Sequence, residues 1–405
     1  MKQKSYQLIT QSKQKLQAQF ERIDNVALCN QQKVLNAFYE YGIELRHFYG
    51  TSGYGYDDVG RDALNKVFAK VFGTEDAIVT PRFTCGTHAI STTLFSLLKS
   101  GDSALSISGK VYDSLHGVIK GEGSLEEFGI SFDCVDLIDG QFDFETIKYV
   151  LASRKIQMVY IQRSRGYDDR NALSIEQIEK ACSFVKTISP DTFIMVDNCY
   201  GEFTAEKEPT EVGADVCVGS LIKNLGGGIA PTGGYVCGTQ KLVNLVWRRF
   251  STPTLLGEVG SFELGYRLFY QGLFLAPHTV AQALKTIYLF AQCLTDAGYD
   301  VTPSPDQIYG DIVLSVKLQD RVKLIDFCQA IQSQSPVDAR AVPTPWAMPG
   351  YSDEVIMAAG CFVQGSSIEL SCDGPMRPPF IAYLQGGVTF EHGIIACGAV
   401  LDRLI

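Results

Sequence analysis

The sequence predicts an α/β protein with a mostly parallel, doubly wound sheet in a large domain and a small α+β domain after it. Short apolar runs alternate with amphipathic helical segments between residues 77 and 220, as in parallel sheets covered on both faces. The rhythm changes after about residue 290, where strand-like runs and two helical segments form a smaller unit. A long apolar helical stretch, residues 261–294, lies between the parts and is expected to bridge them or to bury against a partner subunit.

These observations divide the chain into three regions. Residues 1–48 are expected to form an N-terminal helical arm with a polar, glutamine-rich surface. Residues 49–290 are assigned to the large domain and residues 291–405 to the small C-terminal domain. No internal repeat or low-complexity segment interrupts this order.

Each element of the large domain follows from its local pattern. Apolar residues between Leu64 and Phe72 recur at helical spacing and Gly73 ends the pattern, which predicts a helix. Strands are expected at residues 77–80, 104–108, 132–137, 158–162, 193–197 and 216–220, with helical segments at 86–99, 111–121, 142–154 and 174–188. The small domain is expected to contain strands at 312–318, 367–374 and 380–387 and helices at 321–334 and 391–404.

Composition narrows the class of protein. With 35 basic and 45 acidic residues the formal charge is −10, which argues against a general binder of nucleic acid or of anionic membranes. The polar first 20 residues lack a signal-peptide core, and no apolar run approaches the roughly 18 residues of a membrane helix. Twelve scattered cysteines without a CxxC pair indicate free thiols rather than a metal site. We therefore expect a cytoplasmic enzyme.

Two candidate site residues follow neighbouring strands. Asp197 ends the apolar run 193–197, and Lys223 follows the run 216–220, at the strand ends where doubly wound sheets bind ligands. Burying a lysine there is costly unless its pKa falls or its amine becomes covalently bonded. Taken singly, Asp197 could instead cap a helix or accept turn hydrogen bonds, and Lys223 could reach the surface.

Other segments predict groups that would surround a ligand. Gly86 and Thr87 open a helix, where bare amides and the helix dipole favour a phosphate, and Ser220 places a hydroxyl near the lysine. Tyr112 follows the next strand and could cover a flat ring. His88 could stack on such a ring or simply pack against the protein.

Glycines crowd the segment after the lysine, at positions 226, 227, 228, 233 and 234. They would let the backbone approach a ligand closely or bend sharply. Because they follow the lysine, the segment is neither a Walker loop nor a Rossmann fingerprint.

The ordered set of residues matches the needs of pyridoxal 5′-phosphate (PLP). Its aldehyde bonds a lysine, its ring nitrogen needs a carboxylate, and its phosphate needs amides and hydroxyls. A glycine–threonine step, an aromatic residue, a strand-end aspartate and a Ser-x-x-Lys motif occur in that order.

These residues lie in motifs that resemble fold-type I PLP enzymes, in particular the methionine gamma-lyase-like or aluminium resistance protein family, which is related to cystathionine beta-lyases. The motifs are "TSGYGYDDVGRD", "CGTHAI", "IQRSRGY", "VDNCYGEF", "GSLIKNLGGGIAPTGGY", "QGLFLAPH" and "GSSIELSCDGPMRPPFIAYLQGG". The resemblance implies an aspartate-aminotransferase-like large domain, a small C-terminal domain, and a homodimer or homotetramer with active sites shared between subunits.

The resemblance also implies roles for the residues of the large domain. Lys223 would form a Schiff base with PLP, and Asp197 would pair with the ring nitrogen. The phosphate would be held by Gly86, Thr87 and Ser220.

Further roles concern the ring, the partner subunit and the substrate. Tyr112 or His88 would stack on the ring, and Tyr112 is also a candidate catalytic residue. Tyr56 and Arg61 lie in a segment that resembles the element reaching the phosphate of the neighbouring subunit. Arg377 is the first candidate for the substrate α-carboxylate, since a guanidinium matches its two oxygens, and Arg165 is the second.

The implied activity is that of a carbon–sulfur lyase acting on a sulfur amino acid by β- or γ-elimination. Lys223 would act as the base, which requires its pKa to fall toward neutrality. An aminotransferase, a cysteine desulfurase and a PLP-binding protein without lyase activity are the alternatives. A desulfurase would need a mobile cysteine, and no cysteine lies in a plainly suitable loop, although Cys361 and Cys372 stay open.

Overall fold

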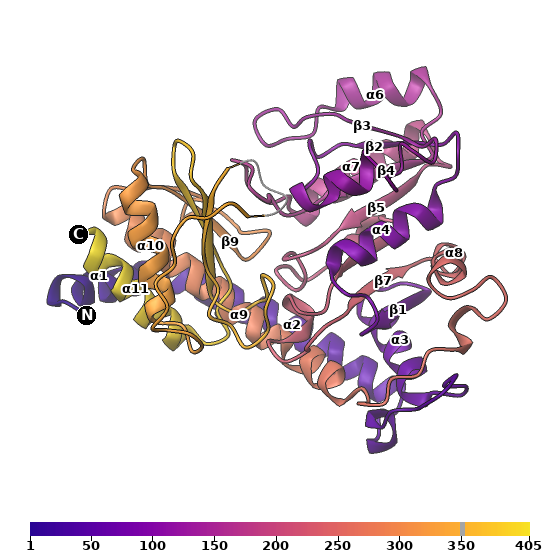
Figure 1. The fold of residues 1–405 in the computed structure, drawn as a ribbon, viewed down its shortest axis with the longest axis horizontal. Coiled ribbons are helices and arrows are strands. Elements are labelled where there is room, and N and C mark those ends of the chain that lie inside the picture. The colour runs from indigo at the N-terminus through magenta and orange to yellow at the C-terminus, as the bar shows by residue number, and fades with distance from the viewer. Residues whose placement is uncertain (349–352) are drawn as a thin grey trace.

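A seven-stranded sheet forms the centre of the large part of the molecule in the computed structural model, which describes residues 1–348 and 353–405 (Figure 1). Its strands are β1 (Asp76–Thr80), β2 (Ser103–Ser106), β3 (Ser131–Cys134), β4 (Met158–Gln162), β5 (Phe193–Asp197), β6 (Val216–Ser220) and β7 (Gly234–Gly238). They lie in the order β1-β7-β6-β5-β4-β2-β3, and β7 runs antiparallel to both neighbours whereas the other pairs are parallel. The predicted mostly parallel sheet is therefore confirmed.

Helices cover both faces of this sheet. They are α3 (Val59–Val71), α4 (Gly86–Leu97), α5 (His116–Ile119), α6 (Phe144–Ser153), α7 (Ile175–Ile188) and α8 (Gln240–Phe250). Alternate residues of β4 face opposite layers: Met158 and Tyr160 share a cluster with α4 and α8, whereas Val159 and Ile161 share one with α6 and α7. Burial on both faces explains why the strands of this sheet read as continuous apolar runs.

Three strands were absent from the sequence-based expectation: β7, β8 and β10. In β7 the two flanking glycines obscured the strand pattern, yet Gly234 is needed there for close packing. A Cβ atom at this position would lie 3.0 Å from the Cβ of Ala89 in α4. The glycine therefore lets α4 approach the sheet.

The C-terminal part contains a five-stranded antiparallel sheet, which confirms the predicted small α+β unit. Its strands are β8 (Asp300–Thr302), β9 (Val313–Lys317), β10 (Val355–Ala358), β11 (Ser371–Pro375) and β12 (Ile381–Gln385), in the order β10-β11-β12-β9-β8. Helices α10 (Arg321–Ser333) and α11 (Phe390–Leu404) pack together beside it.

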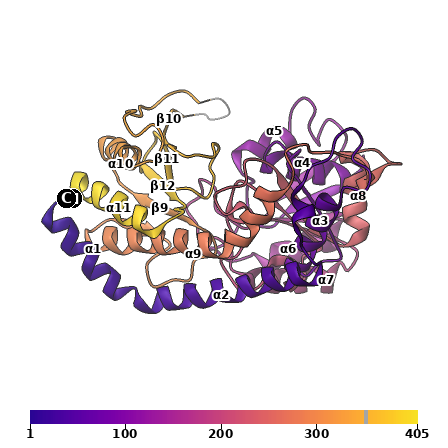
Figure 2. The ribbon, with the colours of Figure 1, turned by 90° about the horizontal axis from the view of Figure 1, so that it is seen from below.

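Two long helices connect the parts. After α1 (Gln3–Lys15), α2 (Gln17–Glu40) runs beside α9 (Arg267–Asp296), and both extend from one sheet to the other (Figure 2). The sequence-based boundary at residue 290 falls inside α9, which has no break there. No helix among residues 1–348 and 353–405 combines the length and apolar character needed to cross a membrane.

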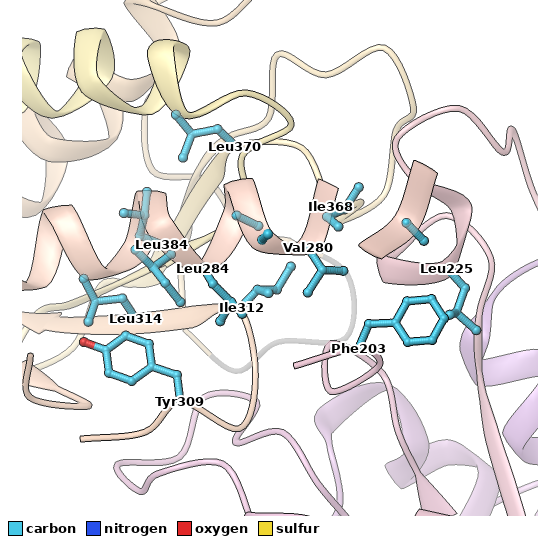
Figure 3. Close-up of a cluster of buried hydrophobic side chains, with 14 of the residues drawn as sticks. Phe203, Leu225, Val280, Leu284, Tyr309, Ile312, Leu314, Ile368, Leu370 and Leu384 are labelled. Carbon is cyan, nitrogen blue, oxygen red and sulfur yellow. The ribbon is translucent and has the colours of Figure 1, made fainter. Parts of the chain in front are cut away.

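A single hydrophobic cluster continues from the small sheet through α9 into the large part (Figure 3). Its members in the close-up include Phe203, Leu225, Val280, Leu284, Ile312, Leu314, Ile368 and Leu384. Because α9 contributes to both sides of this cluster, it fixes the small sheet relative to the edge of the large one.

Candidate active site

A cavity of about 310 Å³ lies where β5 and β6 end and α4 begins. It is lined by six of the predicted site residues, which are Gly86, Thr87, Tyr112, Asp197, Ser220 and Lys223. Parallel strands bring their carboxyl ends to one edge of the sheet, so residues 26 positions apart in the chain meet there.

Lys223 reaches the small domain from the end of the segment after β6. Its Nζ donates a hydrogen bond of 3.0 Å to the carbonyl oxygen of Ser366 and lies 3.7 Å from the centre of the Tyr200 ring. The side chain is half-buried, and its Nζ contacts the small domain at the cavity instead of extending to the surface.

The charge state of Lys223 differs from the sequence-based expectation. Burial is the largest single influence and lowers the pKa of the ammonium, but the phenol of Tyr200, the thiol of Cys199 and the carboxyl of Glu202 together raise the pKa by more. The pKa therefore lies above the ordinary lysine value instead of falling toward neutrality. The described groups that act on this amine include the phenol of Tyr200, the thiol of Cys199 and the carbonyl oxygen of Ser366, and none of these is cationic.

Asp197 is buried at the end of β5, with 6% of its surface exposed. Its Oδ2 accepts a hydrogen bond from the Tyr160 hydroxyl at 3.2 Å, and its Oδ1 accepts one from the Cys199 amide at 3.1 Å. Burial raises the pKa of the carboxyl, and these hydrogen bonds lower it in part. Asp197 therefore accepts a turn hydrogen bond while it also faces the cavity.

The amino end of α4 forms another wall of the cavity. Cys85 caps this helix, since its Sγ accepts a hydrogen bond from the His88 amide at 3.4 Å. The Thr87 hydroxyl lies 2.9 Å from that of Ser114. A Cβ atom at Gly86 would lie 3.2 Å from the Cβ of Ser220, so the glycine keeps open the space between helix and strand. Amides, hydroxyls and a helix dipole directed at one space suit a phosphate.

Tyr112 and His88 were alternatives for stacking on a ring, and the structure separates them. Tyr112 lines the cavity, and its amide donates to Gln162 Oε1 at 2.7 Å. His88 does not line it: the ring packs edge-on against Phe83, and Nδ1 accepts from the Thr84 amide. Within one chain, Tyr112 therefore faces the cavity, whereas His88 follows the alternative in which it packs against the protein.

Tyr56 and Arg61 lie away from this cavity in the same chain. Tyr56 is exposed and stacks with Tyr54, at a centroid distance of 5.5 Å. Arg61 is buried, not an exposed helix arginine, and donates to Asp62 and to the carbonyl oxygen of Gly55. Their contribution to a neighbouring subunit's site stays a prediction.

The two arginines proposed for the substrate line a second cavity of about 540 Å³, which shares Tyr112 and Gln162 with the first. Arg165 is 1% exposed and donates to the carbonyl oxygens of Thr302 and Val313 in the small domain. The side chain of Arg377 is 53% exposed and pairs with Asp353 at 2.9 Å. Arg165 thus holds the two domains together, and Arg377 is the arginine with an accessible guanidinium.

The cysteines named for a desulfurase are both buried and lie outside the cavity. Cys361 contacts the carbonyl oxygen of Leu370, and Cys372 lies 3.7 Å from Cys328 Sγ. Cys85 and Cys199 are the thiols that line the cavity.

Two residues with left-handed backbone, which sequence reasoning missed, contact the lysine. Tyr200 has a φ of +70° and Ser366 a φ of +55°, conformations that cost roughly 1–3 kcal/mol each. Tyr200 lies in the motif "VDNCYGEF", three residues after Asp197, so its position was a usable signal. Ser366 is 143 residues from Lys223 in the chain, and no local pattern could pair them.

The first glycines after Lys223 bend the chain and pack against α9, and they do not line the cavity. Gly227 and Gly228 have φ values of +56° and +80°. A Cβ atom at Gly227 would meet the carbonyl oxygen of Gly272 in α9, and one at Gly272 would meet that of Gly226, so loop and helix touch through their main chains.

The cavity fits PLP by the chemistry of its groups. It combines a primary amine, a buried carboxyl, an aromatic face and an amide-and-hydroxyl pocket that a Cβ atom at Gly86 would narrow. Among the described residues no group of three or more His, Cys, Asp or Glu side chains is arranged to hold a metal ion.

Known proteins resemble this chain over nearly its whole length. The family model of methionine gamma-lyase matches residues 5–405. The uncharacterized protein YnbB of Bacillus subtilis (strain 168) is 45% identical over 391 residues, which are 95% of this chain and 93% of that protein. A carbon–sulfur lyase involved in aluminium resistance from Clostridium novyi NT has a TM-score of 0.96 and 47% identity, with 100% of this chain and 97% of that chain covered.

A more distant likeness concerns the fold alone. The pyridoxal-5′-phosphate dependent protein YhfS of Escherichia coli has a TM-score of 0.65 at 16% identity, with 94% of this chain and 97% of that chain covered. The predicted fold, that of fold-type I PLP enzymes, is confirmed by this likeness.

Proposed function

The chain belongs to the methionine gamma-lyase family, and from this premise we propose that it is a PLP-dependent carbon–sulfur lyase acting on a sulfur amino acid. The observation that carries the proposal is the cavity itself. Lys223 lies in one cavity with Asp197, Ser220 and the amino end of α4, the set of groups that PLP chemistry requires.

Each wall of the cavity would hold a different part of PLP. Lys223 would bond the aldehyde carbon, and the buried Asp197 would hold the proton on the ring nitrogen. The α4 amides with the hydroxyls of Thr87 and Ser220 would hold the phosphate, while Tyr112 would cover the ring. When bound, PLP supplies an electron sink that stabilises the negative charge left by loss of the substrate α-proton.

The chain's own residues would move and place the protons. Lys223 Nζ would take the proton from the substrate α-carbon and so favour β- or γ-elimination of a thiol. Because the surroundings raise the pKa of the free ammonium, Lys223 would have to give a proton to solvent before its amine could bond the aldehyde carbon. Arg377, whose guanidinium is accessible, would bind the substrate α-carboxylate.

We propose that the active form is a homo-oligomer with shared sites, located in the cytoplasm. The exposed, stacked Tyr54 and Tyr56 support the first point, because exposed aromatic residues are typical of interfaces. Twelve free cysteines fit a reducing compartment. The oligomeric state can be measured by light scattering, and monomers that are fully active would contradict sharing.

A visible absorbance scan tests the proposal, with wild type beside Lys223→Ala and before and after L-cysteine, L-methionine and L-cystathionine. We expect a yellow protein whose band changes in the variant and shifts with one of the amino acids. Release of thiol, ammonia and a keto acid would establish elimination. Turnover that needs an added keto acid would establish an aminotransferase instead, and a protein that takes up no PLP would refute the proposal.

A further inference from the structure

One carbonyl oxygen of the small domain accepts two hydrogen bonds from the large domain at the cavity. The Ser366 oxygen accepts from Lys223 Nζ and from the Tyr200 hydroxyl, both at 3.0 Å. The same Nζ lies 3.7 Å from the centre of the Tyr200 ring, a cation–π contact. Lysine, phenol and carbonyl oxygen therefore form a closed set of three mutual contacts, which we name the lysine cradle.

A buried carboxylate shapes the loop that carries Ser366. Glu369, 5% exposed, accepts from the amides of Phe362 and Val363 at 2.8 Å and from the Ser367 hydroxyl at 3.2 Å. We name residues 362–367 the Ser366 loop. These three hydrogen bonds to one carboxylate hold the loop in one shape, and none of them involves a residue of the large domain.

The Ser366 loop contacts the large domain next to the lysine. Directly after it, the Ile368 amide donates to the carbonyl oxygen of Ile222, at 3.3 Å. Gly365 and Ser366 line the same cavity as Lys223 and Tyr200. The lysine cradle thus joins the cavity to a small-domain segment that is otherwise held by Glu369.

Backbone strain supports a role for this arrangement beyond packing. Tyr200 and Ser366 both have positive φ values, which residues other than glycine rarely adopt. Arg163, fully buried, donates to the carbonyl oxygen of Gly201 and to Asn198, on either side of Tyr200. The surroundings therefore hold the phenol under the lysine in spite of its unfavourable backbone.

We propose that Tyr200 and the Ser366 carbonyl position the free ammonium of Lys223, and that covalent bonding of this lysine partly releases the Ser366 loop from the large domain, since the hydrogen bond from Tyr200 remains. The positioning half stands without a cofactor, whereas the release half rests on the proposed function. Tyr200 is in this proposal a positioning residue for Lys223.

The chemistry of bonding explains the release. An ammonium has three N–H donors. It first gives one proton to solvent, and the resulting amine then bonds the aldehyde carbon while the aldehyde oxygen leaves as water with two hydrogens from the nitrogen. The nitrogen then has no N–H, or one if it is protonated again. Ser366 thereby loses a charge-assisted hydrogen bond and keeps the one from Tyr200.

Hydrogen–deuterium exchange of the full-length protein tests both halves, read on peptides covering residues 360–370. The Ile368 amide reports on the contact with the large domain, whereas the amides of Phe362 and Val363, bound to Glu369, report on the shape of the loop itself. Without PLP, we expect Lys223→Ala and Tyr200→Phe to exchange there about three- to tenfold faster than wild type, the factor of one net hydrogen bond.

Tyr383→Phe is the matched control, because the Tyr383 hydroxyl also joins the domains, through the carbonyl oxygen of Tyr167 at 2.8 Å. It should leave exchange of the Ser366 loop unchanged. On addition of PLP, exchange in wild type should rise toward that of Lys223→Ala, and the variant should not respond.

Each outcome tests a different part of the proposal. Equal exchange in wild type and Lys223→Ala without PLP would overturn the cradle. A PLP absorbance band with unchanged or slower loop exchange would overturn the release. If no PLP band forms, the proposed function fails, whereas the comparison without PLP still decides whether Tyr200 and Ser366 position the lysine.

Discussion

The two walls of the cavity are built in different ways. The large-domain wall consists of side chains at strand ends and the amino end of a helix, such as Asp197 and Ser220, each buried in a sheet covered on both faces. The small-domain wall is a loop that offers a backbone carbonyl, that of Ser366, and is shaped by one buried carboxylate.

This difference assigns different tasks to the two walls. Side chains fixed by a sheet can hold reacting groups within the narrow limits that catalysis needs. A loop held by a few hydrogen bonds can respond to a change in its partner, since local opening requires little free energy. We therefore expect changes in the large-domain wall to remove activity and changes in the small-domain wall to alter affinity or dynamics.

The largest effect is expected for Lys223→Ala. Loss of the base and of the amine that bonds the cofactor should lower turnover of a sulfur amino acid by at least about 1,000-fold. Lys207→Ala, an exposed lysine in the same domain, is the control and should retain full turnover. Substantial activity of the Lys223 variant, measured as keto-acid release, would contradict the claim that the large-domain wall holds the reacting groups.

The next effect is expected for Asp197→Asn, which keeps the shape of the side chain and removes its charge. Turnover should fall about 100-fold or more, because the ring nitrogen would lose the partner that keeps it protonated. PLP should still bind through Lys223, so the absorbance band should persist. A variant with wild-type kcat would show that this carboxyl only accepts the turn hydrogen bond from Cys199.

The two arginines test the comparison further, because both line the second cavity but only Arg165 bridges the domains. Arg165→Ala should lower the free energy of unfolding by about 2–4 kcal/mol, since buried carbonyl oxygens lose charged donors. Arg377→Ala should change stability by less than about 0.5 kcal/mol but raise KM. Urea unfolding and steady-state kinetics separate the two, and the reverse pattern would contradict the assignment.

The smallest effect concerns Glu202, buried behind the large-domain wall, where its Oε1 accepts from the Tyr235 hydroxyl at 2.7 Å. Burial raises the pKa of this carboxyl to about 8. The folded state therefore keeps a proton that the unfolded chain has lost. Its contribution to stability is complete below the unfolded pKa, near 4.5, and is lost as pH rises through about 8.

Glu202→Gln removes this pH dependence. Between pH 5 and pH 7.5 the variant should gain stability relative to wild type by roughly 1 kcal/mol per pH unit, measured by urea unfolding. Glu122→Gln, an exposed carboxyl, should follow wild type. Parallel curves for wild type and the Glu202 variant would show that the carboxyl is ionised in the folded protein.

Much of the large-domain wall was predictable because it depends on periodicity and chain order. Asp197 ends the apolar run that became β5, Lys223 follows the one that became β6, and Gly86 begins the expected helix, which ends at Leu97. The strand β7 was missed because a glycine stands at each end: Gly234 packs against α4 and Gly238 against the start of β6, contacts that no local pattern records.

The sequence by itself determined the α/β class, the order of most strands and helices, and the residues that meet at the ends of β5 and β6. These follow from hydrophobic periodicity and from the geometry of parallel strands, which act over short segments. Only the tertiary structure decided that Ser366 would accept from Lys223 and that Arg165 would bridge the domains. Those outcomes depend on contacts between segments far apart in the chain, and such contacts form only when both sheets pack against α9.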